Sequence, residues 1–108
     1  MTANKIDLSK YDIDTIDINT FGGLINLNEL YLSSNQISKI NDPSTFNSLI
    51  NLKILSLENN QLVSLNQSIF VGLQNLEEVY LGSNPISQKQ PSFVRSLCST
   101  NPKCKIYL

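Results

Sequence analysis

Apolar residues recur along this chain in a phrase with near-constant spacing. Within each copy, two apolar residues alternate with polar ones, and an Asn followed by one further apolar residue completes the phrase, which occupies residues 27–37, 52–62 and 76–86. Its Asn stands at Asn35, at Asn60 25 residues later, and at Asn84 a further 24 residues on. A fixed period in this range predicts a solenoid, in which each copy forms one coil.

The first part of each copy has the alternation of a strand. Successive strand side chains point to opposite faces, so Leu30 and Leu32 are expected to face inward while Glu29, Tyr31 and Ser33 face outward. The spacing then loosens into a turn, and only this first part is predicted to be a strand. Later in each coil a Phe and a Leu return to the interior from the opposite side, as Phe46 with Leu49 and Phe70 with Leu73.

The repeated Asn is predicted to have a structural task. Where the strand ends and the chain turns inward, backbone groups would be buried without partners, and an Asn side chain supplies both donors and an acceptor. An isolated Asn is usually a turn former, but turn chemistry alone does not explain recurrence at one register. Asn35, Asn60 and Asn84 are therefore expected to form a ladder across the coils.

The two ends of the chain are predicted to be caps around three regular repeats at 25–86. Residues 1–24 carry apolar residues 24 or 25 positions before those of the first regular repeat, with Tyr11 in place of the Asn, and are expected to be a degenerate N-terminal cap repeat. Residues 87–108 are expected to form a C-terminal cap, with a short helix over 90–98 and a last strand at 105–108. This makes one domain with about five strands.

Composition favours one small soluble domain and excludes two classes of partner. The 108 residues have room for one core. A net charge of −1 and a pI near 5.2 lack the electrostatic footprint of a nucleic-acid binder. No apolar run approaches the roughly 20 residues that cross a bilayer, and residues 1–7 lack the apolar stretch of a signal peptide. We expect no nucleic-acid partner and no membrane insertion.

Residues 24–86 resemble the typical 24-residue class of leucine-rich repeats, which has the pattern LxxLxLxxNxL and carries FxxL in its second half. The resemblance implies a right-handed, curved α/β solenoid with a parallel sheet of about five strands on its concave side. It also implies binding of other proteins and favours an extracellular or secreted location, because that class occurs mainly in receptors and matrix proteins. The flanking caps of those families carry more cysteines than the two in this chain.

Those two cysteines, Cys98 and Cys104, lie where the predicted cap helix meets the last strand. The chain has no His and no second cysteine pair, so a zinc site lacks ligands, and neither a metal nor a cofactor is expected. Two interpretations stay open. A small secreted domain would staple its end with a disulfide, whereas a cytosolic protein would keep two reduced, partly buried thiols.

Catalysis finds little support in this sequence. Without His, the usual Ser-His and Cys-His nucleophile arrangements are impossible, and the chain has no Gly-rich phosphate loop, HExxH or CxxC motif. The adjacent carboxylates of Glu77 and Glu78 are expected to point to opposite sides of a strand, which suits a solvated face better than an acid–base pair. We expect a protein that is not an enzyme.

The outward face of the predicted sheet is the candidate binding surface. Aligned strands place Asp7, Tyr31, Ser56, Tyr80 and Tyr107 in one column and Lys5, Glu29, Ile54, Glu78 and Lys105 in the next. Tyr31 and Tyr80 would stand about 10 Å apart across Ser56, because strands lie about 4.8 Å apart. The predicted ligand-binding residues are Glu29, Tyr31, Ile54, Ser56, Glu58, Glu78, Tyr80 and Tyr107.

Two functions fit such a face. Tyr side chains bury a large area and keep a polar tip, which favours recognition of a protein or peptide by a monomer, with the carboxylates selecting a basic or hydrogen-bond-donating partner. The alternative is a structural or self-assembling unit that forms a weak homo-oligomer and has no separate ligand. It fits because Tyr is also common in strands that bind nothing.

Overall fold

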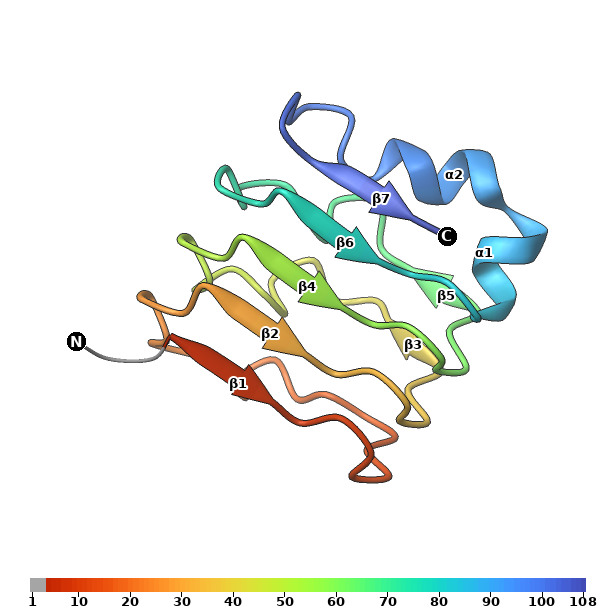
Figure 1. Cartoon of the computed structure of the whole chain (residues 1–108), viewed down its shortest axis with the longest axis horizontal. Helices are drawn as coiled ribbons and strands as arrows, with labels where there is room; N and C mark the ends of the chain where they lie inside the picture. The colour runs from red at the N-terminus through yellow and green to blue at the C-terminus, as the bar shows by residue number, and fades with distance from the viewer. Residues whose placement is uncertain (1–3) are drawn as a thin grey trace.

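The computed structural model describes residues 4–108 and is organised around a five-stranded parallel sheet (Figure 1). The strands lie side by side in the order β1-β2-β4-β6-β7, so each coil of the chain adds one strand beside the last. Each strand has three residues: β1 Lys5–Asp7, β2 Glu29–Tyr31, β4 Ile54–Ser56, β6 Glu78–Tyr80 and β7 Lys105–Tyr107. The predicted parallel sheet is confirmed.

The register of the sheet is the one expected from the sequence. Tyr31 pairs with Ser56, and Ser56 pairs with Tyr80, so these side chains form one row across the middle of the sheet. The neighbouring row contains Ile54 between Glu29 and Glu78. Between the two rows the inward-facing residues run in the order Ile6, Leu30, Leu55, Val79 and Ile106.

The core lies behind the sheet, enclosed by the return segments of the coils. The inward residues of the central strands are fully buried, and so are Leu32, Leu57 and Leu81 just beyond the strand ends. On the opposite side, three phenylalanines one coil apart stack in a row, with ring centroids 5.9 Å apart for Phe21 and Phe46 and 6.5 Å apart for Phe46 and Phe70. This row brings the return segments into the same core as the sheet.

A second, smaller sheet corrects the expectation that each coil has only one strand. β3 (Lys39–Ile40) pairs in parallel with β5 (Ser64–Leu65) on the return path of the coil. Ile40 and Leu65 are buried there, and neighbouring backbone groups bond from coil to coil, as in Val63 N–H to Ser38 C=O at 2.8 Å. Pairing satisfies backbone groups that a loose turn would leave without partners.

The single cap helix expected over residues 90–98 is wrong in its extent. Two shorter helices occupy this region, α1 at Pro85–Lys89 and α2 at Pro91–Ser96, and Figure 1 shows them at the C-terminal edge of the sheet. Gln90 between them has φ −135° and ψ 56°, which is not helical. Pro91 explains the break, because a proline disfavours the helical conformation of the residue before it.

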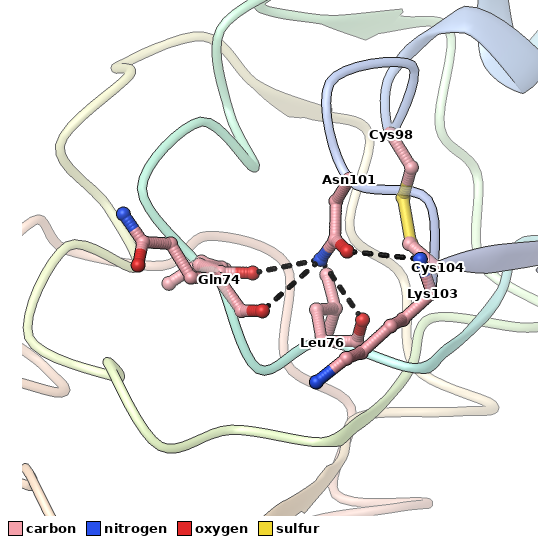
Figure 2. Close-up of a disulfide and its surroundings, with 7 residues drawn as sticks. Gln74, Leu76, Cys98, Asn101, Lys103 and Cys104 are labelled. Carbon is pink, nitrogen blue, oxygen red and sulfur yellow. Dashed lines mark hydrogen bonds between the residues drawn. A yellow bond between two sulfur atoms is a disulfide. The ribbon is translucent and has the colours of Figure 1, made fainter.

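The last strand is held by a disulfide and by one asparagine (Figure 2). Cys98 and Cys104 are joined, with Cα atoms 5.9 Å apart, so the disulfide interpretation is confirmed. Within the loop that they close, the Asn101 amide donates to the carbonyls of Leu73 (3.3 Å) and Leu76 (3.0 Å) in the preceding coil. These contacts fix the loop against the coil that carries β6.

The N-terminal unit is less buried than the centre of the protein. Ile6, Leu8, Ile13, Ile16 and Leu24 are half-buried and pack against the core. Tyr11, at the position of the repeated Asn, is 68% exposed. Residues 1–3 of the predicted cap lie outside the described residues.

Candidate binding surface

Two rows of asparagine side chains fix the ends of the strands. At the C-terminal ends, Asn60 is buried; its Oδ1 accepts from the Ile37 N–H at 3.1 Å, and its amide donates to the carbonyls of Leu32 and Leu57 at 3.0 Å. Asn35 and Asn84 make equivalent bonds in their own coils. Each Asn therefore joins two coils at the point where the chain turns inward.

The turn itself needs a left-handed residue directly before each of these asparagines. Ser34, Asn59 and Ser83 have φ angles of 57°, 57° and 56°. Such angles are unusual for residues other than glycine, and the bonds of the following Asn hold the backbone in this conformation. The strand ends are thus set by backbone geometry as well as by the core.

The second row, at the N-terminal ends of the strands, was missed from the sequence. The Asn51 amide donates to the Ile25 carbonyl at 2.7 Å, and the Asn75 amide donates to the Ile50 carbonyl at 2.9 Å. Asn28 adds a bond to the Asn51 carbonyl at 3.1 Å. The signal was present, because Asn51 and Asn75 lie 24 residues apart and each directly precedes a buried leucine.

Between these rows, the concave face has a hollow over its central strand. We call it the slot; its volume is about 270 Å³, and it is lined by Tyr31, Ser33, Ile54, Ser56, Glu58, Glu78 and Tyr80. Tyr31 and Tyr80 form the two walls, since β4 lies between their strands. Ser56 and Ile54 form the floor. Ser56 is only 4% exposed, so this predicted surface residue lies deeper than expected.

The outer sides of both walls are occupied. The Lys5 ammonium lies 5.1 Å from the centroid of the Tyr31 ring, on the β1 side. The Tyr107 ring stacks on Tyr80 from the β7 side, with centroids 4.8 Å apart. These contacts support the rings from outside and leave the sides that face Ser56 open to the slot.

Each wall is also tied to a carboxylate two residues earlier in its own strand. The Tyr31 hydroxyl donates to Glu29 Oε1 at 2.6 Å, and the Tyr80 hydroxyl donates to Glu78 Oε1. These bonds, together with desolvation and the nearby negative charges, raise the pKa of both phenols to about 12. The rings are therefore neutral donors, half-buried and restrained, whereas the sequence predicted only that these side chains face outward.

The structure brings most of the predicted binding residues together, but not all of them. Glu29 lies outside the lining of the slot and accepts a hydrogen bond from Tyr31. Tyr107 also lies outside it and stacks on Tyr80. Glu58 is exposed at one end of the slot. Ser33, which was not among the predicted binding residues, joins the lining, and its hydroxyl is 2.9 Å from that of Ser9.

Gly82 occupies the same row as Ser33 and Glu58 and has a steric reason to lack a side chain. A Cβ atom there would lie 3.1 Å from the Leu108 carbonyl carbon. That is closer than ordinary van der Waals contact, so a side chain at residue 82 would require the backbone after β7 to shift by a few tenths of an ångström.

A larger hollow of about 490 Å³ lies between the 70–74 and 100–103 segments. Its lining includes the polar residues Gln74, Thr100, Asn101 and Lys103, of which Asn101 is already bonded to backbone carbonyls. Within residues 4–108, no group of three or more His, Cys, Asp or Glu side chains could hold a metal ion. No helix in that range is long and apolar enough to span a membrane.

Known families match this chain over its central coils. One family model of the leucine-rich repeat covers residues 42–86 and another covers residues 26–49. The chain belongs to the leucine-rich repeat family. Leucine-rich repeat domains commonly mediate protein–protein interaction, and members of the family are typically binding modules without enzymatic activity. No curated protein sequence matches the chain.

Solved leucine-rich repeat structures share the fold. The leucine-rich repeat domain of APL1B is 28% identical with a TM-score of 0.72, over 76% of this chain and 25% of that one. A leucine-rich repeat protein of Leptospira interrogans is 32% identical with a TM-score of 0.59, over 94% and 30%. A chain of the Drosophila Toll–Spatzle complex is 22% identical with a TM-score of 0.76, over 90% and 14%, which shows the fold alone. This leucine-rich repeat protein thus spans less than a third of each of these chains.

Proposed function

We propose that this leucine-rich repeat protein is a binding module whose concave sheet recognises a protein or peptide through the slot. The observation that carries the proposal is the pair of facing rings, Tyr31 and Tyr80, with the small residue Ser56 between them. A purely structural face gains nothing from such a gap. A ligand side chain that enters it would bury area against two aromatic rings and Ile54.

Restraint of the walls adds to this argument. Tyr31 is held by Glu29 and Lys5, and Tyr80 is held by Glu78 and Tyr107, so little side-chain freedom remains to be lost on binding. Side chains that are ordered before binding cost less entropy when a ligand arrives. Five short strands offer a patch near the small end of specific interfaces, so we expect a modest affinity.

The test begins with the mass of the protein in solution, because self-association through the concave face would be the alternative function. Peptides selected from a displayed random library are then titrated into isotope-labelled protein. We expect the backbone amide signals of Ile54, Ser56 and Tyr80 to shift most. Peptides that shift only signals of the return segments, such as those of Val63 and Val71, would place recognition elsewhere and contradict the proposal.

A further inference from the structure

We propose that the slot takes the guanidinium group of an arginine side chain from an extended segment of the partner, held flat between the Tyr31 and Tyr80 rings. The inference rests on the proposed function and names the chemistry of its ligand. It follows from four features of the slot: its width, its charge, an unpaired hydroxyl on its floor, and the cation already bound to one of its walls.

The width of the slot suits one flat group. The rings stand two strands apart, which is about 10 Å at the usual strand spacing. A single planar layer in contact with both rings needs about 7–8 Å, and two stacked layers need about 10.5–12 Å, at contact distances of about 3.5–4.0 Å. At about 10 Å the slot is about 2 Å wider than one layer needs and slightly narrower than two layers need, so it admits one planar side chain, and a second layer would be crowded.

The charge of the slot is negative. Its lining contains two carboxylates, Glu58 at one end and Glu78 in the wall, and Glu29 stands directly beside it. No lysine or arginine is among the lining residues. On the neighbouring coils, the residues beside Glu58 are Ser33 and Gly82, and neither is basic. Glu29 and Glu78 already accept the tyrosine hydroxyls and lie opposite Lys5 and Lys105 in the sheet. Glu58 is therefore the carboxylate that a neutral ring would leave without a partner and that a cation would compensate.

The floor of the slot contains the Ser56 hydroxyl, which is free to bind a ligand. Ser56 is 96% buried, and within residues 4–108 its hydroxyl forms no hydrogen bond. No fully enclosed side-chain nitrogen or oxygen in that range lacks a partner, so the Ser56 hydroxyl keeps its contact with the open space of the slot. A donor that enters between the rings would reach this oxygen. Guanidinium carries its five N–H donors in the plane of the group, where they point past the ring faces toward Ser56 and Glu58.

One wall already binds a cation from its other side. The Lys5 ammonium lies over the Tyr31 ring at 5.1 Å from its centroid, within the distance at which a cation and an aromatic face attract each other. The inner face offers the same attraction together with a second ring and the acceptors described above. An ammonium group could meet the carboxylates but could not stack on both rings, so arginine is preferred over lysine.

The test uses single amino-acid probes, titrated into the isotope-labelled 108-residue protein. We expect acetyl-arginine amide to shift the amide signals of Ser56 and Tyr80 and to bind at least about tenfold more tightly than acetyl-citrulline amide, which has the same length and planarity but no charge. Nα-acetyl-lysine amide, which keeps its side-chain ammonium, is expected to bind at least about threefold more weakly than the arginine probe. Equal binding of citrulline or lysine would overturn the assignment.

Three variants localise the effect. Ser56→Tyr should abolish binding of the arginine probe, because a third ring would fill the slot in the way that Tyr107 covers Tyr80. Glu58→Gln removes one charge at an exposed position and should weaken the probe several-fold even if the first variant fails to fold. Glu77→Gln is the matched control, since this exposed carboxylate lies outside the slot, and it should bind as the parent does. Unchanged binding to Glu58→Gln would contradict the proposal.

The outcome is separable from that of the proposed function. If library peptides need Tyr31 and Tyr80 but carry no arginine preference, the concave face binds peptides by other side chains and only the arginine assignment fails. If the arginine probe occupies the slot while the peptides bind to the return segments, the slot chemistry stands and the proposed function fails.

Discussion

At the scale of single residues, burial separates the side chains that hold the fold from those offered to a partner. Asn35, Asn60 and Asn84 are at most 5% exposed, and their amides bond to backbone groups. Tyr31 and Tyr80 are half-buried, and only their hydroxyls form hydrogen bonds, while Lys5 and Tyr107 contact their rings. Changes to the asparagines should therefore alter stability, and changes to the tyrosines should alter binding.

Asn60→Ala is expected to destabilise the protein by about 1–3 kcal/mol, because it removes the side-chain acceptor of the buried Ile37 N–H. It also removes one of the two asparagine amides that donate to each of the carbonyls of Leu32 and Leu57. Chemical denaturation of the parent and the variant measures this. Asn47→Ala is a control at an exposed position. A loss below about 0.5 kcal/mol, the ordinary range for surface substitutions, would rule out a structural ladder.

Tyr31 and Tyr80 should ionise about two pH units later than ordinary tyrosines, with a pKa of about 12 for each. Because the folded pKa lies above the unfolded value of about 10, the stability from these bonds is complete below pH 10 and is lost as the pH rises through 12. Ultraviolet titration detects the phenolates. Glu29→Gln should lower the pKa of Tyr31 toward its usual value; an unchanged titration would show that Glu29 is not the cause.

At the scale of elements, the sequence allowed prediction of the strands but not of everything between them. Leu30, Leu55 and Val79 alternate with polar neighbours at a fixed period, so both the strands and their register could be assigned. β3 and β5 have two residues each, which is too short to show alternation. The helix break at Gln90 could have been expected from Pro91, since proline restricts the residue before it.

The slot also has features that could be predicted from the sequence and features that could not. The repeat period predicts the rows of side chains on the sheet, and with them the positions of Tyr31, Ser56 and Tyr80. The bonds from the phenols to Glu29 and Glu78, and the position of Lys5 over Tyr31, depend on side-chain rotamers. Periodicity carries no information about rotamers, so the restraint of the walls emerged only from the structure.

The disulfide belongs to this scale because it secures one element, β7. Closing the short loop between Cys98 and Cys104 stabilises the protein by about 2 kcal/mol on the chain-entropy model. Reduction should therefore accelerate hydrogen exchange at Ile106 and Tyr107 before it affects β4. Intact mass after alkylation of the native protein shows whether the bond is present. Two freely alkylated thiols in protein handled without reductant would contradict it.

At the scale of the whole molecule, the coils form one continuous core that presents one face. The central strands β2, β4 and β6 are buried on their inner side, bonded at both ends by asparagine rows, and together carry the slot. The outer strands β1 and β7 contribute Lys5 and Tyr107, which brace the walls. The fold thus places its most firmly held strands under the proposed binding site.

The measurement that tests this account most directly is the affinity of one selected peptide for the double variant Tyr31→Ala/Tyr80→Ala, determined by calorimetry beside the parent. We predict more than a tenfold loss of affinity, because both walls of the slot are removed, while circular dichroism shows the fold intact. The control is Ile50→Ala/Val71→Ala, which removes exposed apolar groups away from the slot and should bind as the parent does. A double tyrosine variant that binds the peptide as tightly as the parent would contradict the central claim.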